Sequence, residues 1–219
     1  ISLIIAIPLG IYAGYKPESK TSKIIMGSSI LGFSMPTFWV GIIFIMIFAV
    51  HLGWLPSTGR GDIGTFLGIN SSLFTLNGLS HVFLPALNLA LFKISSVIRL
   101  TRAGTREIIL QDYITFARSK GLSEKRIVLV HILKNILIPI VTVVGLEFGS
   151  LIAFSTVTET VFAWPGMGKL IIDSIYNLDR PVIVAYLMII VTFFVFLNLI
   201  VDILYTFLDP RVRIKGDSQ

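Results

Sequence analysis

Five apolar stretches dominate this chain and limit the folds that it can adopt. They cover residues 1–15, 24–52, 81–98, 136–157 and 182–208. A helix needs about 20 mostly apolar residues to cross a bilayer, and the last four stretches qualify, with room for tilt or a break. Because 54% of the 219 residues are hydrophobic, a soluble domain could not bury them all. The sequence therefore predicts an all-α, multi-pass membrane protein: a helical bundle forming a single transmembrane domain over residues 1–219.

The positive charges predict on which side of the membrane each connection lies. Of the 18 Lys and Arg residues, 14 fall in the first, third and fifth connections, namely residues 15–23, residues 99–134 and the C-terminal tail. The tail contributes Arg211, Arg213 and Lys215. Cytoplasmic loops carry an excess of Lys and Arg, so we expect these three connections and the C-terminus to be cytoplasmic. This topology explains the net charge of +6 better than nucleic-acid binding does.

The first apolar stretch is short and begins at Ile1 rather than at Met. We therefore expect an N-terminal truncation that leaves five spans of a total of six. A signal peptide is disfavoured, because no basic residue precedes the apolar run and no clear cleavage site follows it. Gly10 and Gly14 form a small-xxx-small pair, which is typical of close helix packing. Prolines predict kinks or breaks within or near the ends of four spans, at Pro8, Pro36, Pro85 and Pro139.

Residues 99–134 form a basic segment between two spans and carry eight of the cations. The sequence favours a helix from residue 101 to residue 120, and Gly121 is a natural C-terminal cap. Ser123 can begin a new helix with Glu124 in its first turn. The segment therefore predicts a helix–glycine–helix elbow that points into the cytoplasm.

One face of this elbow is expected to carry small residues. Tyr113, Ala117 and Gly121 are spaced i, i+4 and i+8, which places them on the same side of a helix. Such a narrow face suits insertion into the groove of a partner protein. A helix that lies on lipid headgroups through its cations fits the spacing equally well.

Lys93 and Glu147 are ionisable residues well inside predicted spans. Charges at membrane depth are costly and usually face a bundle interior or a water-filled cavity. We expect an intramembrane Lys93–Glu147 pair or a position for either residue along a transport pathway. Alternatively, Lys93 extends toward the cytoplasmic end of its helix at Arg99, which lies about 9 Å away along the axis.

Residues 158–173, within the connection 158–181 between the last two spans, have a polar, aromatic and glycine-rich sequence. The run Trp164-Pro165-Gly166 predicts a turn, and residues 167–175 predict a short amphipathic helix. An interfacial helix with an aromatic anchor fits this composition.

Motifs for catalysis and metal binding are absent from the sequence. The chain has no Cys, which excludes disulfides, thiolate chemistry and Cys-based zinc sites. His51, His81 and His131 are far apart and show no ligand spacing. The sequence contains no GxxxxGK[ST], HExxH or GxSxG motif. We therefore expect no enzyme activity, no metal and no cofactor on this chain.

The elbow sequence resembles a loop of a known family. The run DYITFARSKGLSEKRIVLVHILKNILIP is similar to the cytoplasmic "EAA" loop of permease subunits in bacterial binding-protein-dependent ABC importers. Thr115, Phe116 and Ala117 stand in the Glu-Ala-Ala places, Gly121 stands in the glycine place and Lys134 in that of the final proline. The form DYxxxARxKGLS is typical of the dipeptide, oligopeptide and nickel branch of this family.

Four further segments resemble the same branch, and the resemblance covers essentially all 219 residues in order. These segments are FSMPTFWVGIIFIMIFAVHLGWLPSTG, LPALNLALFKISSVIRLTRAG, TETVFAWPGMGKLIIDSIYNLDRPV and NLIVDILYTFLDPRVR. The resemblance implies the fold of type I ABC importers and a place in the bacterial cytoplasmic (inner) membrane. It also implies that residues 158–173 lie at the extracytoplasmic face, near a docked binding protein.

A coupling role for the elbow also follows from the resemblance. In such importers the elbow occupies a cleft on an ATP-binding subunit and transmits its closure to the spans. The implied coupling residues are Asp112, Tyr113, Phe116, Ala117, Arg118, Gly121, Leu122 and Ser123. Ala117 and Gly121 would permit close approach, and Arg118 would pair with an acidic group of the partner.

The implied partners are a second homologous permease subunit, two P-loop ATPase subunits that bind ATP and Mg, an extracytoplasmic substrate-binding protein and membrane lipids, without nucleic acid. The implied cargo is di- or oligopeptides, with nickel or glutathione as the alternative. A secondary transporter or channel is a further alternative, because broken helices and intramembrane charges are compatible with it. The sequence shows no internal repeat, and it contains an elbow that needs a partner; both features argue against that class. The absence of catalytic motifs argues against an intramembrane enzyme.

Overall fold

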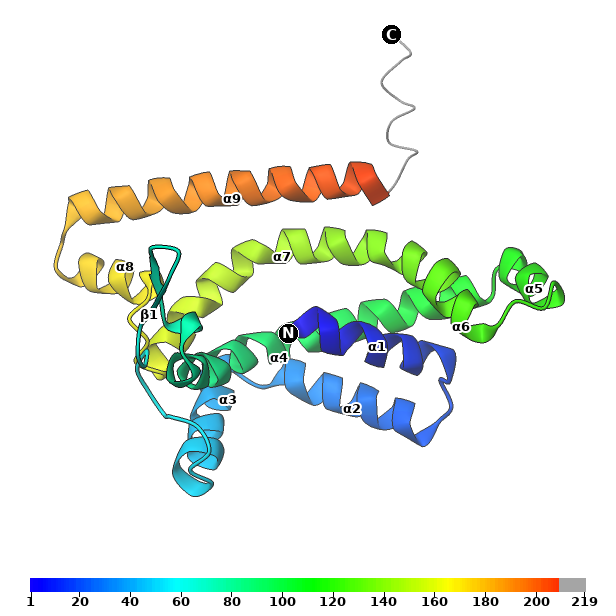
Figure 1. Cartoon of the computed structure of the whole chain (residues 1–219), viewed down its shortest axis with the longest axis horizontal. Helices are drawn as coiled ribbons and strands as arrows, with labels where there is room; N and C mark the ends of the chain where they lie inside the picture. The colour runs from blue at the N-terminus through cyan, green and yellow to red at the C-terminus, as the bar shows by residue number, and fades with distance from the viewer. Residues whose placement is uncertain (209–219) are drawn as a thin grey trace, which may run out of the picture. The chain divides into compact units, whose positions relative to one another are not determined.

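The computed structural model describes residues 1–208, and most of them are helical (Figure 1). The chain divides into two units. Unit 1 contains residue 1 and residues 34–92 and 149–192, and unit 2 contains residues 2–33 and 93–148 and, among the described residues, 193–208. Three long helices contribute residues to both units: α4 (Leu76–Ile109), α7 (Leu133–Val161) and α9 (Arg180–Leu208).

Unit 2 begins with two consecutive helices, α1 (Ser2–Tyr15) and α2 (Lys20–Ser34), that lie side by side (Figure 1). Their contact is polar at one point, where the Ser22 hydroxyl donates a hydrogen bond of 3.1 Å to the carbonyl oxygen of Ala13. The Ala13 side chain is fully buried. A small side chain on α1 therefore allows α2 to approach closely enough for this bond.

The glycine pair of α1 packs directly against α4, as its spacing predicted. A β-carbon at Gly10 would lie 2.5 Å from Thr101 Cβ, and one at Gly14 would lie 2.6 Å from Thr105 Cβ. Both threonines are fully buried. Only hydrogen fits at these two positions, so the predicted close helix packing is confirmed.

The apolar core of unit 2 lies between the second half of α4 and the start of α7. Val97 and Ile98 come from α4, and Ile136 and Ile140 come from α7, one helical turn apart. All four are almost completely buried. Ile136 also lies against Gly104, at which a β-carbon would approach its Cγ2 atom to 3.1 Å. The contact of Ile136 with Gly104 joins the two helices that lead to the elbow.

Unit 1 combines the first half of α4 with the second half of α7 and several short elements. These elements are α3 (Thr37–Phe44), the π-helix η1 (Ile45–His51), β1 (Gly64–Phe66), β2 (Ile69–Ser71), the 3-10 turn η2 (Ser72–Phe74) and α8 (Met167–Tyr176). β1 and β2 form an antiparallel hairpin with Gly64 opposite Ser71. Buried Asn88 links α4 to α7 by donating to Thr158 Oγ1 at 3.2 Å.

All five predicted apolar stretches are helical, with two differences in their extent. Residues 24–52 do not form one continuous helix, because the helix stops at Ser34 and restarts at Thr37, after Pro36 in an extended conformation. In contrast, α4 continues past residue 98 to Ile109 and includes the start of the helix expected from residue 101. No Gly or Pro lies at residues 99–103, so the helix has no local reason to end there, and it continues through Gly104.

Helix length and composition mark several membrane spans among the described residues. Three helical segments are long and apolar enough to cross a membrane: Leu76–Ile109, Glu124–Gly145 and Arg180–Leu204. The α2 and α3–η1 pair makes a fourth if it counts as one broken span, and α1 is a shorter apolar helix of 14 residues. The cations predicted for the tail, Arg211, Arg213 and Lys215, lie outside the described residues.

Candidate functional site

The predicted elbow is present, and its turn closes through local hydrogen bonds. Helix α5 (Asp112–Ser119) ends where the Leu122 N–H donates to the Ala117 carbonyl at 3.2 Å and the Gly121 N–H donates to the Arg118 carbonyl at 2.9 Å. Gly121 has a φ of +75°, so this pair of bonds is a Schellman motif with glycine in its left-handed position. The predicted cap at Gly121 is confirmed.

The second arm of the elbow begins at Ser123, the predicted start. The Ser123 carbonyl accepts the Ile127 N–H at 3.0 Å, although its side chain makes no capping bond. The short helix α6 (Glu124–Arg126) follows and continues through the π-helix η3 (Ile127–Ile132) into α7. The backbone from the turn to the long α7 helix is therefore continuously helical.

The exposed face of the elbow differs from the one predicted from residue spacing. Ala117 is 6% exposed and Ile114 is fully buried, whereas Phe116 is 60% exposed. Gly121 lies beyond the end of α5 at a left-handed φ, so it does not continue the face of Tyr113 and Ala117. Ala117 thus packs against its own chain, and the open face carries aromatic rather than small side chains.

Most of the remaining predicted coupling residues are accessible. Asp112, Gly121 and Ser123 are exposed, and Leu122 is half-buried. Lys120 lies over the ring of Phe116, with its Nζ atom 4.5 Å from the ring centroid. The open face therefore combines an aromatic ring with a cation above it.

Arg118 pairs within its own chain. Its Nε atom donates to Glu124 Oε1 at 3.0 Å, and the Tyr15 hydroxyl donates to Glu124 Oε2. The hydrogen bond to Glu124 raises the pKa of Arg118 further above its usual value. The three side chains connect the two arms of the elbow to the end of α1.

Tyr113 makes a second connection between the elbow and α7. Its hydroxyl accepts a hydrogen bond of 3.2 Å from Asn135 Nδ2, and its ring centroid lies 6.3 Å from that of His131. Partial burial raises the pKa of Tyr113 above its usual value. The phenol is therefore neutral at physiological pH and can keep this hydrogen bond.

The structure also brings Lys93 and Glu147 together. Lys93 Nζ lies 3.0 Å from Glu147 Oε2, and the side chains are 7% and 24% exposed. The Ser96 hydroxyl donates to the other carboxylate oxygen at 3.3 Å. The pair joins α4 to α7 in the interior of unit 2.

The connection after α7 folds as its sequence predicted. The Gly166 N–H donates to the Trp164 carbonyl at 2.9 Å, and α8 begins at Met167. Glu159 was not among the predicted site residues, yet its Oε2 atom accepts the Lys169 N–H at 2.9 Å. A carboxylate at this position satisfies a free donor at the helix N-terminus and complements its positive end.

The contact between Tyr15 and Glu124 gave no signal in the sequence. Tyr15 and Glu124 are 109 residues apart, and no periodic pattern connects positions at that distance. For Glu159 the sequence contained only a weak signal. An acidic residue seven positions before Gly166 can reach the N-terminus of the next helix only if the chain turns back between them, as it does here. Both contacts depend on tertiary structure.

The sequence matches, over residues 6–214, the family described as the inner membrane component of binding-protein-dependent transport systems. The chain belongs to this family. It is therefore a multi-pass protein of the inner membrane, which confirms the predicted membrane location. The family is one of transport components and not of enzymes, which agrees with the prediction for this chain.

Curated relatives of this inner membrane component are named as peptide permeases. The chain is 41% identical over 217 residues to a di/tripeptide transport system permease protein DppB of Pseudomonas aeruginosa, covering 93% of this chain and 64% of the relative. It is 40% identical to the oligopeptide transport system permease protein AppB of Bacillus subtilis, covering 97% and 66%. The chain thus spans about two thirds of the length of these relatives.

A solved structure shares the fold. A chain from the inward-facing MetNI methionine ABC transporter matches with a TM-score of 0.69 and 16% identity, covering 95% of this chain and 88% of that chain. At this identity the match concerns the fold alone. It confirms the predicted helical bundle of the type I importer kind.

Proposed function

We propose that this chain is the membrane-spanning permease subunit of an ABC importer that carries peptides, and that its elbow couples the pathway to ATP hydrolysis on partner subunits. The names of the relatives support peptides as cargo. The chain spans 64% of the length of the first of these relatives, so cargo, coupling and partners are part of this proposal.

The observation that carries the coupling proposal is the exposed aromatic face of α5. Phe116 and Tyr113 are 60% and 42% exposed on a short helix that ends in a closed turn. Exposed aromatic side chains on a helix are typical anchors for a hydrophobic groove. Lys120 above Phe116 favours a groove with an acidic rim. A cleft on an ATPase subunit with an apolar floor and acidic edges fits this face.

The proposed coupling works through the turn at Gly121 and the continuous helix that follows it. Movement of a cleft that holds Phe116 would displace α5, and the turn at Gly121 would pass this displacement to α6, η3 and α7. Asp112, at the start of α5, and Leu122 and Ser123, in the turn, would contact the walls of the cleft. Ala117 contributes by packing the elbow against its own chain.

The elbow is then cytoplasmic, and so is the C-terminus, while α8 faces the extracytoplasmic binding protein. A second, homologous permease would complete the pathway, and two ATPase subunits would bind ATP and Mg. We assign Lys93 and Glu147 to fastening α4 against α7, because the lysine is nearly fully buried and already paired.

Replacement of Phe116 by Ala in the complete importer tests the proposal. Loss of a central aromatic anchor costs about 2 kcal/mol or more, so we expect a tenfold or greater loss of the ATPase activity that peptide-loaded binding protein stimulates. Phe116→Tyr keeps the ring and should retain most of this activity, and Thr115→Ala, on the same helix, should change it little. Normal transport and normal stimulated ATPase in Phe116→Ala would refute the coupling assignment.

A further inference from the structure

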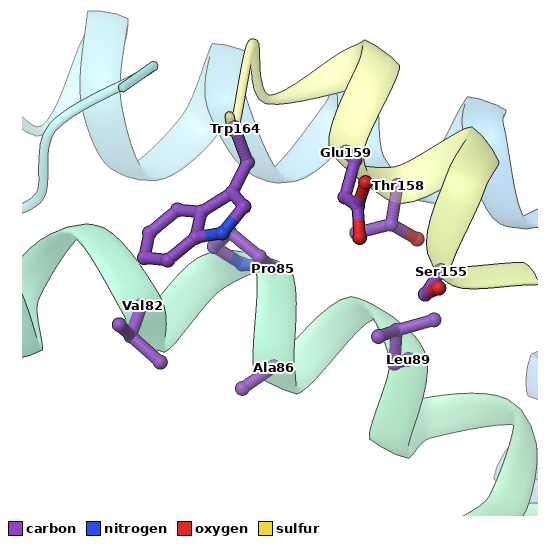
Figure 2. Close-up of a pocket in the computed structure, with 8 residues that line it drawn as sticks. All are labelled: Val82, Pro85, Ala86, Leu89, Ser155, Thr158, Glu159 and Trp164. Carbon is purple, nitrogen blue, oxygen red and sulfur yellow. The ribbon is translucent and has the colours of Figure 1, made fainter. Parts of the chain in front are cut away.

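A cavity of about 190 Å³ lies within unit 1, between the first half of α4 and the end of α7 (Figure 2). Val82, Pro85 and Leu89 line it from α4, and Glu159 and Trp164 line it from the other side. This volume is smaller than the 300–1,000 Å³ or so of sites for drug-sized ligands. It suits one amino-acid residue of a larger ligand.

The cavity combines apolar walls with a single ionisable group. Figure 2 shows the Glu159 carboxylate directed from α7 toward α4, and the indole of Trp164 lying close to Val82 and Pro85. Among the residues that the structure describes, Glu159 accepts the N–H of Lys169, and a carboxylate has about four acceptor positions. Capacity for a further donor therefore remains at the wall of the cavity.

The chemistry of this lining selects a cation. A carboxylate beside apolar walls repels anions, and a partly desolvated negative charge is stabilised by a positive partner with hydrogens to donate. An indole ring also attracts a cation within about 6 Å of its centroid. The apolar walls, in turn, favour a hydrocarbon group next to the charge.

We propose that this cavity binds a primary ammonium group attached to an apolar side chain, supplied by the amino-terminal residue of a cargo peptide. This assignment rests on the proposed function. The α-amino group of a peptide has a pKa of about 7.7–8.0 and is mostly protonated at neutral pH. An amino-terminal Leu or Val would place its ammonium at Glu159 and its side chain against the α4 wall.

The ethanolamine headgroup of a lipid carries the same ammonium chemistry, but a hydroxyl in the lining favours a peptide. Ser155 lies in the lining and donates its own hydrogen to the Ile152 carbonyl at 2.7 Å. Its oxygen can therefore still accept a hydrogen bond. A peptide offers a backbone N–H for this acceptor, whereas the acyl chains of a lipid offer none.

The test measures peptide binding to the complete permease–ATPase complex, without binding protein, in nanodiscs of phosphatidylcholine and phosphatidylglycerol. The probes are Leu-Ala and N-acetyl-Leu-Ala, which differ in the ammonium group, and calorimetry gives the affinities. We expect Leu-Ala to bind at least tenfold more tightly, in line with one charge-assisted hydrogen bond. Glu159→Gln keeps an acceptor for Lys169 and should bind both probes equally.

Two further variants control for the fold and the cavity. Asp173→Asn removes an exposed acid from α8, outside the cavity lining, and should keep the tenfold preference. Ala86→Leu fills the lining without changing its charge and should weaken both probes. A preference for Leu-Ala that persists in Glu159→Gln would overturn the proposal.

The arms of the experiment separate the possible failures. If Leu-Ala does not bind and phosphatidylethanolamine added to the discs binds in a manner that depends on Glu159, the ligand is a lipid and the peptide assignment is wrong. Uptake of labelled Leu-Ala by the full system with its binding protein tests the proposed function separately. No uptake by the unmodified system would refute that function, whereas uptake unchanged by Glu159→Gln would refute only the cavity assignment.

Discussion

Gly121 and Gly27 differ in backbone conformation, since Gly121 has a positive φ and Gly27 does not. A β-carbon would meet no atom within 4 Å at either position. Gly121 has a φ of +75°, where an L-residue costs about 1–2 kcal/mol, whereas Gly27 lies inside α2. Space therefore cannot explain any difference between alanine variants at the two positions, and backbone conformation can.

Gly121→Ala should loosen the elbow by about 1 kcal/mol, and Gly27→Ala should stabilise α2 by a similar amount. Hydrogen exchange of the amides of residues 117–122 in the purified complex measures the first effect. Faster exchange there in Gly121→Ala, together with weaker stimulated ATPase, is the expected result. Equal exchange in the two variants would contradict the role given to the left-handed glycine.

The Lys93–Glu147 pair is predicted to act as a unit. Removing one partner leaves a buried charge and costs about 3 kcal/mol, somewhat less where the remaining group is partly exposed. Lys93→Met leaves Glu147, which is 24% exposed, and Glu147→Met leaves Lys93, which is 7% exposed. Glu147→Met should therefore be the more destabilising change.

Thermal unfolding of the purified complex measures the interaction energy between Lys93 and Glu147 through a double-mutant cycle. We expect the double variant Lys93→Met/Glu147→Met to unfold at a higher temperature than either single variant. Effects of the two single changes that simply add would show that the residues do not interact, whatever their distance.

At the scale of elements, two sets of side-chain bonds connect the elbow to helices. Tyr15 ties it to α1 through Glu124, and Tyr113 ties it to α7 through Asn135. The Arg118–Glu124 pair is exposed, and exposed pairs contribute about 0–1 kcal/mol. This network should therefore affect how the elbow is positioned much more than whether the chain folds.

Tyr15→Phe removes only the hydroxyl that reaches Glu124. We expect an unfolding temperature within a few degrees of the unmodified complex, and a several-fold loss of stimulated ATPase with unchanged basal ATPase. Tyr12→Phe is the matched control, since the Tyr12 hydroxyl, on the same helix, interacts with Thr21 and Ser19 and not with the elbow. An equal loss in both variants would indicate a general effect of α1 rather than the bond to the elbow.

Local patterns in the sequence predicted the elements that local physics determines. Gly121 is predictable as a cap, and Met167 as the start of a helix after Trp164-Pro165-Gly166, because turn and cap chemistry depends on neighbouring residues. The β1–β2 hairpin was not predicted, because strands of three residues are too short to show alternation. Burial of Ala117 was missed for another reason: spacing shows which residues share a face, but not which face meets the rest of the chain.

At the scale of the whole molecule, the charge pattern makes a directional prediction. The chain contains no Cys, so single cysteines report their side of the membrane without a background. We expect Lys125→Cys, at an exposed position in the second arm of the elbow, to resist a membrane-impermeant maleimide in intact cells, and Asn70→Cys, in the β1–β2 hairpin, to react. Lysed cells should label both. The opposite pattern would invert the predicted topology and remove the elbow from the cytoplasm.

The Schellman turn has a kinetic consequence for assembly. Its hydrogen bonds close between residues 117 and 122 without any partner, so the shape that we propose for docking is already formed. Binding then requires no coupled folding, and little conformational entropy is lost on contact. Encounter with the partner should proceed at the rate of rigid-body docking. Substitutions on the aromatic face should consequently shorten the lifetime of the assembled complex, while leaving the speed at which it forms nearly unchanged.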